Sequence, residues 1–182
     1  EFVAVASAAT GVDADTHLYF HDGDSGERSG QLELSVVPNN PDWSPAGDKI
    51  AFSAIGGDEI WRIRFLGSGI RYIQRQGDVW DTEHPVVLVP PASGKNRFNP
   101  TFFPDGELLL FSEVDQSSYS GEDANACNAG AADEAGTLCN GYSDPGAKTW
   151  AVAAQPGATP VFLARAAAPG VADELSAPPQ PT

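Results

Sequence analysis

One segment of the sequence occurs twice, and this repetition constrains the fold more than any other feature. Residues 41–53 read PDWSPAGDKIAFS and residues 100–112 read PTFFPDGELLLFS. In both copies an aromatic residue follows a proline by two positions, and Pro-x-Gly, an acidic residue and an apolar run ending in Phe-Ser come next. Proline fixes φ at one corner of a turn and glycine accepts a positive φ, so each copy predicts a turn between two β-strands. Such repetition indicates stacked units that bury one another's faces.

Each copy extends into a unit of four strands. Residues 59–65 alternate apolar and charged side chains, which predicts a third strand, and the apolar residues 86–89 predict a fourth. After the second copy, residues 148–153 and 159–163 take the same two places. Four short strands with a tryptophan in the third are typical of a propeller blade.

The N-terminal part of the chain matches an incomplete earlier unit. Residues 2–7 match the second strand, residues 17–21 the third and residues 31–36 the fourth, with a hairpin turn at 22–27. The sequence therefore predicts an all-β fold, a β-propeller of four-stranded antiparallel blades with about three blades per chain.

We expect one domain over residues 1–182. Its predicted parts are blade 1 at about 1–38 (incomplete), blade 2 at about 39–97, blade 3 at about 98–168 and a C-terminal tail at 169–182. Two insertions interrupt the pattern, one at residues 66–84, with a possible hairpin through 70–73, and one at residues 113–147.

The repeat resembles the TolB-like propeller repeat, a relative of the WD-type blade. That family's pattern is roughly Pro-x-aromatic-Ser-Pro-Asp-Gly-Lys-x-Ile-Ala-Phe-Ser, followed by an Ile-Trp or Leu-Tyr strand, which Ile60-Trp61 and Leu18-Tyr19 match. Ala46 stands in place of the usual Asp, and Phe103 in place of the usual Ser. The resemblance covers most of the chain apart from the two insertions. It implies a propeller fold and a periplasmic or secreted setting, but no particular reaction.

Three blades are too few to close a propeller ring, which takes at least about four. Residues 86–89 and 108–110 are apolar on both faces of their strands, as expected for blades covered by neighbours. Open apolar faces predict association. The chain is then either part of a longer propeller or a homodimer that closes a six-bladed ring, in which the missing first strand could come from the partner. We favour the homodimer.

The charge of the chain restricts its partners. The sequence has 10 basic and 25 acidic residues, a formal net charge of −15. Such a surface repels nucleic acids and anionic lipids, whereas it suits divalent cations, cationic ligands or simply solubility. The sequence contains no apolar run long enough to span a membrane. We expect a small-molecule or protein ligand if the chain binds one.

Cys127 and Cys139 are the two cysteines, and they lie in a segment rich in Gly, Ala, Asn and Asp. Neither a CxxC spacing nor a nearby histidine supports a redox or metal site, so we predict a loop-closing disulfide. It would contribute roughly 3 kcal/mol to stability and would indicate an oxidising compartment. We therefore expect a periplasmic or secreted protein, although no secretory signal is visible in this chain.

A few residues could hold a divalent metal such as zinc or calcium. The candidates are His17, His21, His84, Asp22 and Asp24, and Asp81 and Glu83 flank His84. His17 and His21 are about 13 Å apart on an extended strand, so one ion cannot join them unless the strand bends. The alternative reading is ordinary turn chemistry for the aspartates and exposed strand ends for the histidines.

The acidic residues of the second insertion have a simpler reading. We predict a solvated surface for Glu113, Asp115, Glu122 and Asp123.

Two functions follow as hypotheses. The first is an exported, non-catalytic binding or scaffold module that self-associates and presents loops around a central channel. The alternative is a metal-dependent hydrolase of esters or phosphoesters, with its site at the channel mouth and a metal-activated water. No nucleophile motif or phosphate-binding loop is recognisable, and no catalytic residue can be assigned.

Overall fold

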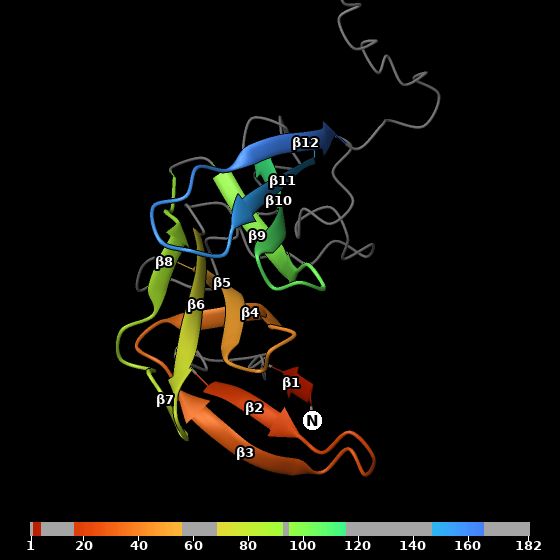
Figure 1. Ribbon diagram of the computed structural model, residues 1–182, viewed down its shortest axis with the longest axis vertical. Coiled ribbons are helices and arrows are strands. Elements are labelled where there is room, and N and C mark those ends of the chain that lie inside the picture. The colour runs from red at the N-terminus through yellow and green to blue at the C-terminus, as the bar shows by residue number, and fades with distance from the viewer. Residues whose placement is uncertain (1, 5–16, 56–68, 93–94, 116–146, 166–182) are drawn as a thin grey trace, which may run out of the picture.

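The computed structural model describes residues 2–4, 17–55, 69–92, 95–115 and 147–165 (Figure 1). These residues form strands, turns and irregular segments and contain no helix. Their strands make three antiparallel sheets, which lie side by side in Figure 1. The prediction of an all-β fold is therefore confirmed for this part of the chain.

The N-terminal sheet has three strands in the order β1-β2-β3. They are β1 (Phe2–Ala4), β2 (His17–His21) and β3 (Arg28–Glu33). These strands lie within or close to the ranges predicted for the second, third and fourth strands of the incomplete unit. Leu18 and Phe20 face the middle sheet, whereas His17 and Tyr19 lie on the opposite face.

The middle sheet contains five strands among the described residues. They are β4 (Val37–Trp43), β5 (Lys49–Ile55), β6 (Gly69–Gln76), β7 (Val79–Trp80) and β8 (Val86–Val89). β6 pairs with β5, β7 and β8. The place beside β5, predicted for residues 59–65, is thus taken by β6, and residues 59–65 lie outside the described residues.

The burial of β6 explains this difference. Ile70, Tyr72 and Ile73 are all buried, although neighbouring residues of a strand point to opposite faces. A strand covered on both faces needs apolar residues on both, which residues 69–73 supply better than an apolar–charged alternation. The strict alternation of residues 59–65 was therefore a misleading guide to the third strand.

The C-terminal sheet has the order β12-β11-β10-β9. Its strands are β9 (Lys95–Phe102), β10 (Leu108–Asp115), β11 (Lys148–Ala153) and β12 (Val161–Arg165). The sequence predicted all four strands of this sheet, and β11 and β12 pair in the expected antiparallel manner.

The first strands β4 and β9 share a bulge at an Asn-Pro pair. Asn40 and Asn99 have φ values of 48° and 50°, and the strand register shifts beside each of them. Proline has no N–H for the ladder, so a bulge is where a sheet tolerates it. Asparagine tolerates the positive φ better than most side chains. Both copies of the repeat therefore contain the same strand bulge as well as the same turn.

Two hydrophobic cores join the sheets through opposite faces of the middle sheet. Toward the N-terminal sheet, the buried core consists of Leu18, Leu34, Ile50, Phe52, Ala54 and Ile73. Toward the C-terminal sheet, it consists of Ala51, Ile70, Tyr72, Leu88, Val89, Phe102, Leu109, Phe111 and Val152. The sheets therefore pack face to face in a propeller-like manner, whereas the number of blades and the closure of a ring stay predictions.

Among the described residues, no helix is long and apolar enough to cross a membrane.

Candidate functional site

The two ends of the sheets differ in their connections. The turns at residues 22–27, 44–48 and 103–107 lie on the same side of the three sheets in Figure 1, here called the short-turn end. A Cβ placed on Gly106 would lie 3.6 Å from Pro45 Cδ, so the turns of the middle and C-terminal sheets are neighbours. From the opposite end, the long-connection end, the chain leaves β1, β5 and β10 toward residues 5–16, 56–68 and 116–146.

Three of the five predicted metal ligands lie in or beside the β2–β3 hairpin turn. His21 Nδ1 lies 3.0 Å from the carbonyl oxygen of Gly26. The Asp22 carboxylate accepts hydrogen bonds from the backbone N–H groups of Ser25 (2.9 Å) and Asp24 (3.1 Å). These N–H groups hold the pKa of Asp22 below its ordinary value, because they stabilise the charged carboxylate. The contacts are those of an aspartate-capped turn.

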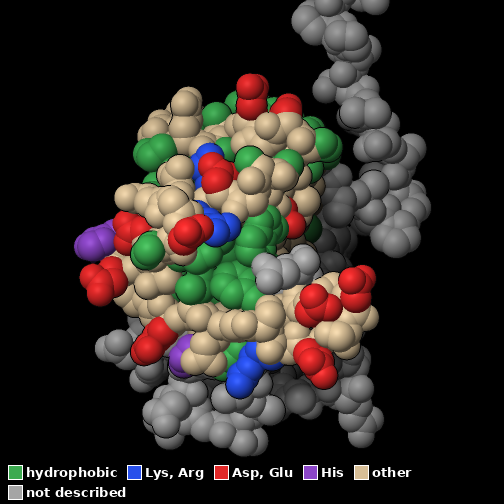
Figure 2. Space-filling view, turned by 60° about the horizontal axis from the view of Figure 1, so that its bottom comes forward, with side chains coloured by type: hydrophobic (Ala, Val, Ile, Leu, Met, Phe, Trp, Pro, Cys, Tyr) green, Lys and Arg blue, Asp and Glu red, His purple; other side chains and the backbone are tan. Residues whose placement is uncertain are grey.

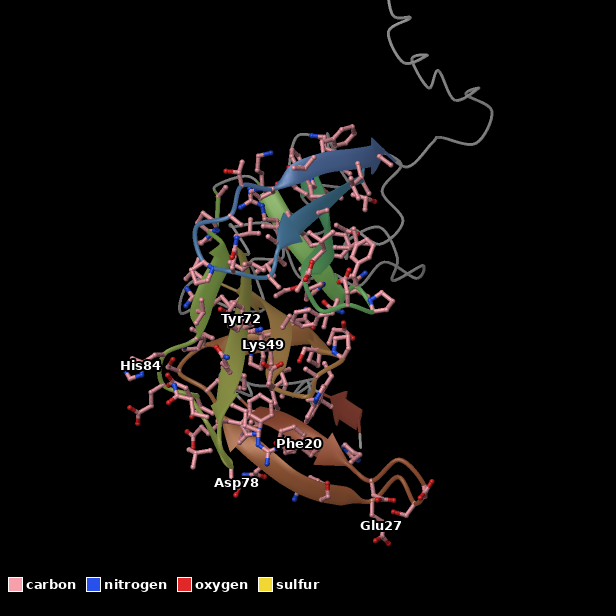
Figure 3. The ribbon with its side chains drawn as sticks, viewed as in Figure 1. Phe20, Glu27, Lys49, Tyr72, Asp78 and His84 are labelled. Carbon is pink, nitrogen blue, oxygen red and sulfur yellow. The ribbon has the colours of Figure 1, made fainter. Side chains whose placement is uncertain are left out.

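The other two predicted ligands lie elsewhere. His84 Nδ1 lies 3.1 Å from Asp81 Oδ1, one of the two acidic residues that flank it in the sequence. His17, at the opposite end of β2 from His21, stacks on Tyr19 with ring centroids 5.8 Å apart. Figure 3 places His84 and Glu27, at the end of the hairpin turn, on opposite sides of the molecule.

The described ranges contain no group of three or more His, Cys, Asp or Glu side chains that could hold one metal ion. The metal site thus stays a prediction without support from the geometry, and the same holds for the hydrolase hypothesis built on it. Cys127 and Cys139 lie outside the described residues, so the disulfide also stays a prediction.

Glu113 is a correction to the sequence analysis. We predicted a solvated side chain, but Glu113 is 2% exposed. Its carboxylate lies 2.7 Å from Lys95 Nζ and 2.8 Å from Arg97 Nε. Burial of a carboxylate is tolerated here because two cations of β9 compensate its charge.

Arg97 also reaches beyond its own sheet. Its Nη1 donates to the carbonyl oxygen of Pro90, in the segment between β8 and β9. The pairing register could have indicated this cluster, since Glu113 directly opposes Arg97 on β9 and Lys148 on β11. Without knowledge of that register, the sequence offered only an acidic residue at the start of an insertion. Of the other acidic residues predicted on this surface, Glu122 and Asp123 lie outside the described residues.

The short-turn end holds a cluster of three aromatic rings. Trp43 packs edge-on against Phe20 (centroids 5.3 Å apart) and against Trp80 (5.6 Å). The short strand β7 brings Trp80 to this junction between the N-terminal and middle sheets. Figure 2, in which the bottom of Figure 1 comes forward, shows an apolar area with acidic side chains on both sides of it. The cluster therefore packs the N-terminal sheet against the middle sheet.

The outer part of the C-terminal sheet carries an exposed apolar surface. Val161, Phe162 and Leu163 of β12 are 61%, 48% and 51% exposed, and Leu108 of β10 is 38% exposed. Leu108 points away from the middle sheet, because Leu109 and Phe111 point toward it. β12 lies at the end of the molecule farthest from the N-terminal sheet (Figure 1). Phe162 packs edge-on against Trp150, which contacts the core shared with the middle sheet, so Phe162 lies on the inner face at the sheet edge. We call Leu108, Val161 and Leu163 the β12 surface.

Comparison with known proteins identifies no family. No protein-family model matches the sequence, and no curated protein matches it significantly. A chain in a solved structure, from a study titled as an analysis of two prolyl endopeptidases and their inter-domain dynamics, superimposes with a TM-score of 0.45. It is 16% identical, and the match covers 82% of this chain but 18% of that chain. This chain is therefore similar in part to a much longer protein, and the TolB-like resemblance stays a prediction.

Proposed function

We propose that this chain is an exported, non-catalytic β-propeller module that self-associates as a homodimer and serves for binding or as a scaffold. The observation that carries the proposal is the β12 surface. In the described part of the chain, each face of the middle sheet is covered by another sheet. The outer face and edge of the C-terminal sheet instead leave large apolar side chains in contact with water.

The cost of that exposure favours association. Burying an apolar side chain such as leucine or phenylalanine gains about 1.5–3 kcal/mol. A second copy that packs on the β12 surface would recover this energy and cover a strand edge that is open among the described residues. The resemblance to the TolB-like repeat and the predicted disulfide support a propeller in an exported setting.

The binding role follows from where the chain makes its long connections. The segments that link the second to the third strand of each sheet leave from one end of the molecule. Binding residues are often on loops held by a rigid scaffold. We therefore propose that this end presents the binding surface around the channel, for a small-molecule or protein ligand, and the charge of −15 favours a cationic one.

Sedimentation over a range of protein concentrations tests the self-association. We expect a mass near twice 19.0 kDa. Substitution of Val161 and Leu163 by lysine should weaken dimerisation at least tenfold. The matched control is Val79→Lys, because Val79 is 70% exposed but lies on β7 of the middle sheet; this variant should dimerise like the unchanged chain.

Salt provides a second check. Two copies with a charge of −15 each repel one another, and salt screens this repulsion. Dimerisation through apolar contacts should therefore strengthen as NaCl is added. A chain that stays monomeric at every protein and salt concentration would rule out the proposal.

A further inference from the structure

We propose that Arg71 of β6 binds the carboxylate group of a ligand at the junction between the N-terminal and middle sheets. The proposal goes beyond the binding role suggested above, because it names a residue and a chemical group of the ligand. It does not depend on self-association.

Arg71 is an exception among the basic side chains of the described residues. In a chain with 25 acidic and 10 basic residues, a basic side chain should easily find a carboxylate. Carboxylates pair with Lys49, Arg75, Lys95 and Arg97, and Arg28 lies over the ring of Tyr19. Arg71 makes no ion pair within the described residues, and its Nε is buried there without a hydrogen-bond partner. A buried donor without an acceptor costs free energy, so it calls for an explanation.

The strand register fixes the surroundings of Arg71. Arg71 lies between Phe52 of β5 and Val87 of β8, on the face of β6 that also carries Ile73. Phe52 and Ile73 belong to the core toward the N-terminal sheet and are fully buried, whereas Val87 is 40% exposed. Arg71 is half-buried, so its Nε is shielded while part of the residue reaches water.

The pairing of β6 with β8 is irregular at this place. Ile70 pairs with Val89 and Arg71 with Val87, so Leu88 is an extra residue opposite the step between them. A β-bulge turns side chains out of their regular direction, and bulges are frequent beside active sites. β6 begins at Gly69, after the connection 56–68 of the long-connection end. Arg71 therefore lies near the end of the molecule that we proposed for binding.

The chemistry of the site favours a carboxylate on an apolar body. A guanidinium group presents a planar fork of N–H donors that matches the two oxygens of a carboxylate. Phosphate also matches this fork, but it would bring up to two negative charges to a chain with a net charge of −15. Arg71 supplies one positive charge between two apolar neighbours. The net charge favours a cationic group elsewhere on the same ligand.

Titration of the full chain with benzoate, followed by calorimetry, tests the site. Benzoate joins a carboxylate to an apolar ring, and we expect saturable binding with a Kd of about 1 mM. Benzamide, which has a similar shape without the charge, and inorganic phosphate should each bind about tenfold more weakly. Arg71→Met keeps an apolar stem and should weaken benzoate binding about tenfold, whereas Arg71→Lys keeps the charge without the fork and should weaken it about fivefold.

The matched control is Arg75→Met. Arg75 lies on the same face of β6 and pairs with Asp78 at 3.0 Å. Because this ion pair is exposed, its loss should leave benzoate binding within about twofold of that of the unchanged chain.

Urea denaturation adds a readout that a purely structural role of Arg71 would not give. Without benzoate, Arg71→Met should unfold at the same or a higher urea midpoint, because it removes a buried charged group that has no compensating partner. Benzoate should raise the midpoint of the unchanged chain and leave that of Arg71→Met unaltered.

Three results would overturn the proposal. If benzoate binds the unchanged chain and Arg71→Met equally well, its site lies elsewhere. If benzoate shows no saturable binding, Arg71 holds no such ligand, and a lower urea midpoint of Arg71→Met would then indicate that the chain itself supplies the carboxylate. If phosphate binds more tightly than benzoate, the ligand class is wrong. Sedimentation tests the self-association separately, so either proposal can fail alone.

Discussion

The middle and C-terminal sheets share one four-strand plan but differ in what surrounds them. The middle sheet is covered on both faces, and its buried residues alternate between two cores. The C-terminal sheet shares one of those cores and leaves β12 exposed. Phe52-Ser53 and Phe111-Ser112 are the same residues at the same place in the repeat. How completely a sheet is buried therefore depends on the neighbouring sheets as well as on its own strand sequence.

One pair of equivalent positions shows how differently the two sheets fill the same place. Ala54 follows Phe52-Ser53, and Glu113 follows Phe111-Ser112. Both are buried, at 4% and 2% exposure. Ala54 lies in an apolar core, whereas Glu113 lies between Lys95 and Arg97. The same position of the repeat can therefore hold an alanine where the surroundings are apolar, or a glutamate where two cations surround it.

Exchange of these two residues should produce the largest effects. Ala54→Glu buries a carboxylate with no cation of its own and should cost more than about 4 kcal/mol of the free energy of unfolding. Glu113→Ala leaves Lys95 and Arg97 without their carboxylate and should cost about 3 kcal/mol. Urea denaturation of the single variants measures both.

The control for this pair is Glu113→Gln, which keeps the shape and one acceptor but removes the charge. It should fall between Glu113→Ala and the unchanged chain. Equal stability of all three would mean that the ion pairs of Glu113 contribute nothing, and the comparison between the two sheets would lose its main support.

The next effect concerns the contact between the two sheets. Asp42→Ala removes the hydrogen bond to the Phe102 amide and should cost about 2 kcal/mol, since bonds to charged groups are the stronger kind. Thr101 is the repeat equivalent of Asp42 and is exposed, so Thr101→Ala should change stability by less than about 0.5 kcal/mol. Chemical denaturation of both variants measures the two losses in the free energy of unfolding. Equal losses would contradict the expected difference between Asp42 and Thr101.

The repeat itself allowed much of the fold to be predicted. Turn chemistry and apolar runs are local, so the strands around both Pro-x-Gly turns and the whole C-terminal sheet were readable from residue types. The third strand of the middle sheet was not, because two candidate segments competed for the place beside β5. Only coverage on both faces, a property of the assembled sheets, favours residues 69–76.

The candidate site was less readable for a similar reason. The buried state of Glu113 depends on Arg97, sixteen positions away in the chain and opposite it in the ladder. The aromatic cluster depends on β7 reaching across to Phe20 of another sheet. Long-range register of this kind leaves no pattern in a single sequence, whereas Asp81 and His84, which are in contact, are only three positions apart in the chain.

A smaller effect should come from the bulge that both first strands share. Asn99→Ala keeps a Cβ at φ near 50° but removes the polar side chain that makes this φ tolerable. It should lower the free energy of unfolding by about 1 kcal/mol. Asn99→Gly should stay within about 0.5 kcal/mol of the unchanged chain, because glycine adopts this φ readily. The same pair at Asn40 in the middle sheet should behave alike. A loss at one site alone, measured by thermal or urea unfolding, would show that the two bulges are not equivalent.

The smallest effect is a dependence on alkaline pH at the core between the two sheets. Burial raises the pKa of Tyr72 above its ordinary value of 10.0, and the negative charge of Asp48 adds to the shift. The unfolded chain therefore loses this proton at a lower pH than the folded one, so the stability tied to Tyr72 is complete below about pH 10 and declines as the pH rises through the folded pKa. In Tyr72→Phe this decline is absent, and its free energy of unfolding should fall less than that of the unchanged chain between about pH 9 and about pH 11. Urea midpoints across that range decide the matter, because parallel pH profiles would show that Tyr72 titrates as it does in the unfolded chain and that the core does not exclude water from its hydroxyl.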